Sequence, residues 1–253
     1  MAPTLVPTTV KVIAEDQEPF HFICPRIVAV VGPTGCGKSQ LVARILRDRK
    51  QTIRPTPDVI VYVYSIWQEE LFQQIRDWCE PETPVTFVHG IEELQSKIEF
   101  SPGLCTALIL DDQQQALLES KQFGVKLMTV DVHHKNIILF FICQSLFMHS
   151  KHNALVNRQA SYVIMFRNKR SMYEAEMVGR QIMQLKSDEV HALYKEASKY
   201  RDRSYLVYDT NAETKEYRQL ATSILADDQP QIFFHVSEEY KKQQQQKQRQ
   251  NNV

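Results

Sequence analysis

The chain has 253 residues, and its 30 Lys plus Arg balance its 30 Asp plus Glu, so it carries no formal net charge. This balance excludes nucleic-acid binding through overall charge, and any such contact must come from a local basic patch. The five cysteines are widely spaced, and the longest apolar run, 137–143, is far shorter than the roughly 20 residues of a membrane-spanning helix. We therefore expect a soluble, intracellular protein that is neither secreted nor membrane-spanning.

Short apolar runs alternate with amphipathic patterns from residue 27 onward, after a segment, 1–20, that we expect to be an arm or an edge element. Strands are predicted at 27–31, 59–64, 85–88, 105–110, 137–143 and 162–166. Helices are predicted at 39–49, 67–79, 91–98 and 113–129, with a helix or loop over 145–159. Strands that are apolar on both faces and separated by helices indicate a three-layer α/β fold with a mostly parallel central sheet.

The remainder of the chain has a different pattern. Residues 172–200 read as helical, and 204–208 read as a late strand, antiparallel at an edge of the sheet. The tail 241–253 is polar and rich in glutamine, so disorder is expected there. We therefore predict an arm over 1–20, one domain over 21–235 and a polar tail over 236–253.

A glycine-rich motif follows the first predicted strand directly and precedes the first predicted helix. Three of the seven glycines lie within it, and it fits G-x-x-x-x-G-K-[ST]. Such a loop turns backbone N–H groups toward a phosphate chain at a helix N-terminus. The alternative is a glycine-rich turn that binds no nucleotide. The predicted phosphate-binding residues are Gly32, Pro33, Thr34, Gly35, Cys36, Gly37, Lys38, Ser39 and Gln40.

Individual roles follow from the chemistry of a nucleoside triphosphate. Lys38 is expected to reach the β- and γ-phosphates, and the hydroxyl of Ser39 is expected to bind Mg²⁺. Two carboxylates, Asp111 and Asp112, end the predicted strand 105–110. Asp111 suits Mg²⁺ binding through water, and Asp112 suits polarisation of the attacking water. Alternatively, Asp112 caps the N-terminus of the following helix.

A polar residue, Gln144, ends the next predicted strand, 137–143. Two predicted strands, 59–64 and 85–88, also lie between the loop and Asp111. An intervening strand, with a polar residue at the end of the next one, resembles the additional-strand branch of the P-loop NTPases. In that branch Gln144 would contact the γ-phosphate or the attacking water. Alternatively, Gln144 hydrogen-bonds a loop backbone.

Five segments resemble the FtsK–HerA superfamily, specifically the genome-packaging ATPases of Polinton/Maverick elements, virophages and poxvirus-like viruses. They are GPTGCGKS (32–39), VYVYSIWQEELFQQI (61–75), LILDD (108–112), HHKNIILFFICQSLF (133–147) and NRQASYVIMFRNKRS (157–171). The phosphate loop is also similar to that of the adenovirus packaging ATPase. The sequence departs from the family after the carboxylates, where LDDQQ is unusually polar.

The resemblance implies an ATP- and Mg²⁺-dependent motor that drives double-stranded DNA into a preformed capsid. It implies a homo-oligomeric ring, a pentamer or hexamer, in the host cytoplasm or nucleus, and contacts with capsid proteins. It also matches Arg158 with an arginine of the family, which suggests that Arg158 reaches the phosphates of a neighbouring subunit. A surface arginine or a local ion pair is the alternative.

Two other function classes remain open at this stage. A GTPase-type switch would need N-K-x-D after a late strand, but 168–171 reads NKRS, so guanine selection has no support. A kinase acting on a small molecule or nucleotide would need an arginine-rich lid. The arginines that could supply one are Arg167, Arg170, Arg180, Arg201 and Arg203.

Overall fold

The computed structural model describes residues 9–12, 18–147, 158–200, 202–215, 218–228 and 231–235. A ten-stranded sheet in the order β1-β12-β11-β10-β9-β3-β8-β7-β5-β6 forms its centre. The parallel strands are β3 (Arg26–Val31), β5 (Val59–Tyr64), β6 (Val85–His89), β7 (Thr106–Asp111), β8 (Ile137–Cys143) and β9 (Ala160–Phe166). The strands paired antiparallel beyond β9 are β10 (Tyr205–Asp209), β11 (Leu220–Thr222), β12 (Ile232–His235) and β1 (Thr9–Val12). The predicted α/β class with a large, mostly parallel sheet is confirmed.

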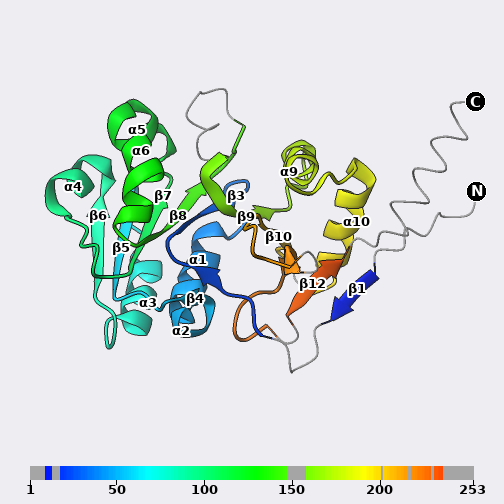
Figure 1. Cartoon of the computed structure of the whole chain (residues 1–253), viewed down its shortest axis with the longest axis horizontal. Coiled ribbons are helices and arrows are strands. Elements are labelled where there is room, and N and C mark those ends of the chain that lie inside the picture. Colours follow the sequence, from blue (N-terminus) through cyan, green and yellow to red (C-terminus); the bar gives the residue numbers. More distant parts are fainter. Residues whose placement is uncertain are drawn as a thin grey trace, which may run out of the picture.

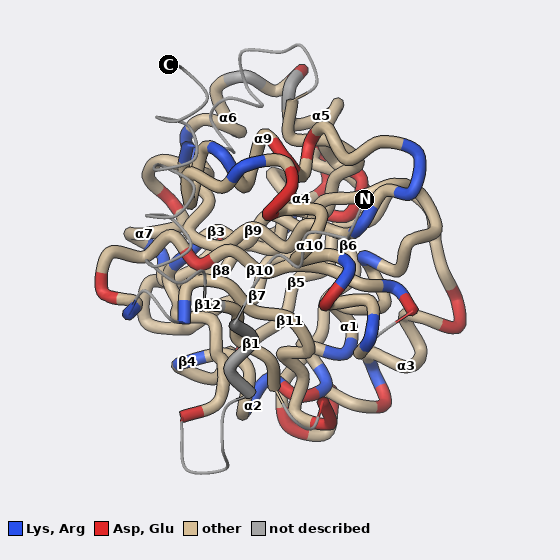
Figure 2. Tube along the Cα trace, turned by 90° about the vertical axis from the view of Figure 1, so that its right-hand side faces the viewer, with Lys and Arg blue, Asp and Glu red and all other residues tan. Residues whose placement is uncertain are grey.

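Helices cover both faces of this sheet (Figures 1 and 2). On one side lie α1 (Lys38–Arg47), α2 (Arg49–Thr52) and α3 (Glu69–Cys79). On the other lie α4 (Gly90–Lys97), α5 (Gln114–Glu119), α6 (Lys121–Lys126), η1 (Leu127–Asp131), α7 (Val132–His134), α9 (Tyr173–Met183) and α10 (Ser187–Ala197). A separate parallel pair joins β2 (Phe22–Ile23) to β4 (Ile53–Arg54).

The parallel strands are apolar throughout because both of their faces are buried. Along β3, Ala29 packs into the core on one side of the sheet, whereas Val28 and Val30 pack into the core on the other. All seven residues of β8 are buried in the same alternating way. A strand with two buried faces needs hydrophobic residues at every position, which is the pattern seen in the sequence.

Three predicted elements need correction. The helix predicted over 113–129 is broken at Ser120, whose hydroxyl bonds the carbonyl oxygen of Ala116, and it continues as a π-helix over Leu127–Asp131. Residues 172–200 form two helices, because Gln184 adopts a left-handed conformation, φ 55°, that ends α9. The late strand is antiparallel as predicted, but it is not at an edge: β10 has β9 on one side and β11 on the other.

The predicted arm and tail, and the segment 145–159, are described only in part or not at all. From the predicted N-terminal arm, Thr9–Val12 pairs with β12 and so forms the last strand at one end of the sheet. The polar tail 236–253 and most of the predicted helix or loop over 145–159 lie outside the described residues. Within the described ranges, none of the helices combines the length and the apolar character needed to cross a membrane.

Candidate functional site

The glycine-rich loop joins β3 to α1 at the carboxyl edge of the parallel strands. Gly37 immediately precedes α1 with φ 101°, and Gly35 has φ 78°; both values lie in the left-handed region that favours glycine. The first turn of α1 contains no acidic residue, and no side chain caps its N-terminus. The N–H groups of this turn, together with the helix dipole, are therefore available to an anion.

The side chain of Lys38 is folded into the loop. It is buried, and its Nζ atom donates hydrogen bonds to the carbonyl oxygens of Gly32 at 2.8 Å and Pro33 at 3.2 Å. A phosphate oxygen is a charged acceptor and binds an ammonium group more strongly than a neutral carbonyl does. The loop thus holds its own cation at its centre, in reach of any anion bound there.

The carboxylate of Asp111, the last residue of β7, lies near two hydroxyl groups, one from β5 and one from the start of α1. Its Oδ2 accepts a hydrogen bond of 2.6 Å from the buried hydroxyl of Tyr62, and the hydroxyl of Ser39 lies close enough to favour the charged form of the carboxylate. Burial raises the pKa of Asp111, while the Tyr62 hydrogen bond, the nearby Ser39 hydroxyl and the charge of Lys38 act to lower it. Ser39 and Asp111, 72 positions apart in the sequence, are thereby brought together.

The oxygen atoms of Ser39 and Asp111 fit a Mg²⁺ ion. Mg²⁺ prefers oxygen ligands and is usually held by one or two carboxylates together with phosphate oxygens and water. A buried carboxylate whose pKa is raised by desolvation would also be stabilised by a cation. Within the described residues no three His, Cys, Asp or Glu side chains cluster to hold a metal ion. The fit therefore requires phosphate oxygens as additional ligands.

Asp112 presents an exposed carboxylate directly after β7. It has a left-handed backbone, φ 52°, and its carbonyl oxygen accepts a hydrogen bond from Ser65 at 3.1 Å. The alternative role as a helix cap is wrong, because Gln113 precedes α5 and no side chain caps that helix. The backbone of Asp112 is thus fixed beside the end of β5, and its carboxylate does not cap α5.

Gln113 is a residue that sequence reasoning missed. It is only 2% exposed, and its Nε2 donates to the hydroxyl of Ser65 at 2.7 Å and to the carbonyl oxygen of Asp111 at 3.1 Å. The side chain of Gln114 similarly donates to the carbonyl oxygen of Ser145, beside the tip of β8. The unusually polar LDDQQ segment therefore connects the carboxylate turn to the ends of β5 and β8. The polarity of this segment was the only sign in the sequence that Gln113 has a role.

Gln144 and the phosphate loop line one cavity of about 940 Å³. Most of the rest of its lining comes from the last two residues of β9, from 167–171, which follow that strand, from 173–175 of α9, and from 202–204, which precede β10. Four basic and two acidic residues line this cavity, leaving a surplus of two positive charges (4 − 2), so it suits a polyanion. The charged residues are Arg167, Lys169, Arg170, Arg203, Glu174 and Asp202.

Other predicted residues lie outside this cavity. Gln40 lines a smaller hollow of about 290 Å³ beside α1, together with Cys36 and Gly37. Arg158 is exposed and lies just before β9. Because β9 runs parallel to β3, Arg158 is at the opposite edge of the sheet from the loop, roughly 20 Å away along the strand. Arg158 is thus not part of its own chain's site.

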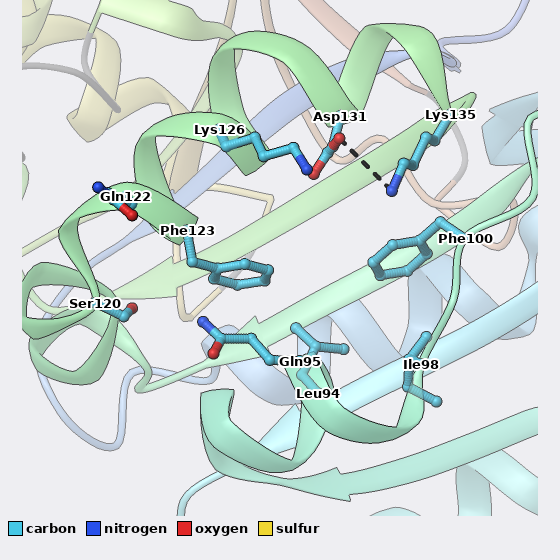
Figure 3. A pocket seen from close by; sticks show the side chains of 10 residues that line it. All are labelled: Leu94, Gln95, Ile98, Phe100, Ser120, Gln122, Phe123, Lys126, Asp131 and Lys135. Atoms are coloured by element: carbon cyan, nitrogen blue, oxygen red, sulfur yellow. Dashed lines mark ion pairs between the residues drawn. The ribbon is translucent and has the colours of Figure 1, made fainter.

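A third hollow, about 660 Å³, lies between α4 and the α6–α7 segment. Figure 3 shows the rings of Phe100 and Phe123 and the ion pair of Asp131 with Lys135 along it. None of the predicted phosphate-binding or carboxylate residues is among those that line it. Other residues of the phosphate loop line the first two hollows, whereas Lys38, Ser39, Asp111 and Asp112 line none of the three.

No family model and no curated protein matches this chain.

Proposed function

We propose that the chain is a P-loop ATPase of the additional-strand type that hydrolyses ATP with Mg²⁺. The observation that carries this proposal is the closeness of the Ser39 hydroxyl to the buried carboxylate of Asp111, whose charged form that hydroxyl favours. It supports the proposal because these two residues, the one after the loop lysine and the first strand-end carboxylate, would be the protein's oxygen ligands to a Mg²⁺–triphosphate.

Each residue then has a distinct task. The loop N–H groups and Lys38 bind the phosphate chain, and Ser39 and Asp111 hold Mg²⁺, which neutralises charge on the β- and γ-phosphates. Asp112, exposed beside Asp111, orients the attacking water and accepts its proton. Gln144, which lines the large cavity together with residues 32–36 of the loop, contacts the γ-phosphate or that water.

We further propose that hydrolysis drives double-stranded DNA into a preformed capsid, as the family resemblance implies. The active form would be a homo-oligomeric ring in which Arg158 of one subunit reaches the phosphates of the next. Its position at the edge opposite the loop supports action between subunits, since it is too far away to serve its own site.

The test combines turnover with assembly. ATP hydrolysis is measured with and without linear double-stranded DNA, and native mass is measured with and without ATP and DNA. A motor should hydrolyse ATP faster on DNA and should assemble into a pentamer or hexamer. A monomer whose hydrolysis is unaffected by DNA at every salt concentration would contradict the motor while leaving the ATPase open.

A kinase remains the second candidate, because Arg167, Arg170 and Arg203 line the same cavity as the phosphate loop. Arginines facing the loop are what a phosphoryl-transfer lid requires. Transfer of labelled phosphate from ATP to a small acceptor, in place of release as inorganic phosphate, would favour the kinase.

A further inference from the structure

Arg203 lies beside the phosphate loop although 165 positions separate it from Lys38. The neighbouring Ser204 is buried, and its carbonyl oxygen accepts a 3.0 Å hydrogen bond from the backbone N–H of Arg167. This bond ties the start of β10 to the end of β9, the strand that pairs with β3 on the side away from β8. The fold thereby fixes the backbone at Arg203 next to the loop.

The Arg203 side chain rests on Gly37. A Cβ atom added to Gly37 would lie 3.3 Å from Nη1 and 3.4 Å from Cδ of Arg203. The positive charge of Arg203 also acts to lower the pKa of the Cys36 thiol, although burial raises that pKa overall. The guanidinium group is therefore within direct reach of the loop and of the N-terminus of α1.

Within the described residues no anion is paired with this guanidinium group, although Asp202 lines the same two hollows. Among the described residues it makes no hydrogen bond or ion pair, and Arg203 is exposed. It lines both hollows beside the loop: the large cavity with Gln144, and the smaller one with Gln40 and Arg44. A phosphate chain lying along the loop would pass between the two hollows and hence beside Arg203.

We propose that Arg203 binds the phosphate chain of the nucleotide held by its own subunit, from the side opposite Asp111. This inference rests on the proposed nucleotide site. Lys38 supplies a single ammonium group, whereas the planar guanidinium of Arg203 offers paired N–H donors that match two phosphate oxygens. Arg203 differs from Arg158 in acting within one chain, so it should contribute to affinity in a monomer.

The experiment measures dissociation constants of the full chain for Mg²⁺–ATP and for Mg²⁺–tripolyphosphate, which lacks the nucleoside. Arg203→Ala should weaken both ligands about 10- to 100-fold, as expected for loss of a charge-assisted hydrogen bond. Arg203→Lys should recover part of the loss because it keeps the charge. Arg54→Ala, which removes an exposed ion pair with Glu18, is the matched control and should bind like the wild type.

Three results would overturn the inference. In the first, Arg203→Ala binds both ligands with wild-type affinity while Lys38→Ala binds them weakly. This result would exclude a role of Arg203 in phosphate binding and would still support the nucleotide site. If both variants bind with wild-type affinity, the proposed nucleotide site is contradicted as well. If Arg203→Ala loses ATP binding but still binds tripolyphosphate normally, Arg203 contacts the nucleoside and not the phosphate chain. Thermal unfolding checks the fold, and Arg203→Gln replaces the alanine variant if that one unfolds.

Discussion

The hydroxyl of Tyr62 donates a 2.6 Å hydrogen bond to Oδ2 of Asp111, so a core residue of β5 reaches the carboxylate at the end of β7. The ring of Tyr62 is fully buried and packs against Phe72 and Phe87. A buried carboxylate depends on such donors, because each hydrogen bond to the charged form offsets part of its desolvation. Tyr62 therefore positions the proposed Mg²⁺ ligand.

Tyr62→Phe should leave the packing in place and raise the pKa of Asp111 further above its ordinary value. The ionised carboxylate is then available only at higher pH, so the acidic limb of the activity profile should move upward. Mg²⁺-dependent ATP binding should weaken by roughly 1–3 kcal/mol. Tyr64→Phe, on the same strand, is the control. An unchanged pH profile would show that Tyr62 does not act through Asp111.

Lys38→Ala should abolish hydrolysis and most nucleotide affinity, because the phosphate chain loses the compact cation at the centre of the loop. Nucleotide binding by calorimetry and phosphate release measure the two effects. Lys50→Ala, which removes an exposed ion pair with Glu82, should behave as the wild type in both assays. Turnover at the wild-type rate in Lys38→Ala would place catalysis elsewhere.

Asp111→Asn and Asp112→Asn should differ in phenotype. The first should lose Mg²⁺-dependent binding by 10-fold or more, since it removes a ligand. The second should bind ATP normally and stop turnover, since it removes only the base. Binding and single-turnover hydrolysis separate the two effects, and identical phenotypes would argue against the division of roles.

Asp111→Asn should also make the fold more stable at neutral pH. Burial holds the folded-state pKa of Asp111 above its unfolded value, so the protonated form favours folding. That contribution is present below the unfolded pKa and is lost as pH rises through the folded pKa. The variant should therefore gain stability over the wild type as pH rises through this window. Denaturant unfolding at several pH values measures it, and a gain limited to acidic pH would contradict the argument.

Arg158→Ala subunits should bind ATP normally and hydrolyse it poorly if Arg158 acts between subunits. Lys38→Ala subunits cannot hydrolyse ATP but still carry Arg158, so adding them should restore part of the activity. Mixed rings are verified by native mass before hydrolysis is measured. Full activity of Arg158→Ala alone, or no recovery in verified mixed rings, would exclude action between subunits.

The sequence predicted what is local and missed what depends on pairing between distant strands. The loop motif, its flanking strand and helix, and the strand ending in Asp111 are continuous segments, so their residues could be identified directly. Tyr62 lies within the predicted strand 59–64, and its ring is buried; its hydroxyl reaches Asp111 only through the register of β5 against β7. Arg203 reaches the loop only because β10 pairs with β9. Neither pairing is encoded in a local pattern.

Because β8 lies between β3 and β7, the length of the side chain at position 144 matters for the proposed site. The loop and the carboxylates stand on strands that do not touch, about 10 Å apart by strand spacing, and Gln144 projects from the strand that fills this gap. A phosphate chain bound as proposed between the loop and Asp111 would pass close to this position. The length of the Gln144 side chain would then decide whether it reaches the terminal phosphate, and Asn, one methylene shorter, would leave room for a water molecule in between.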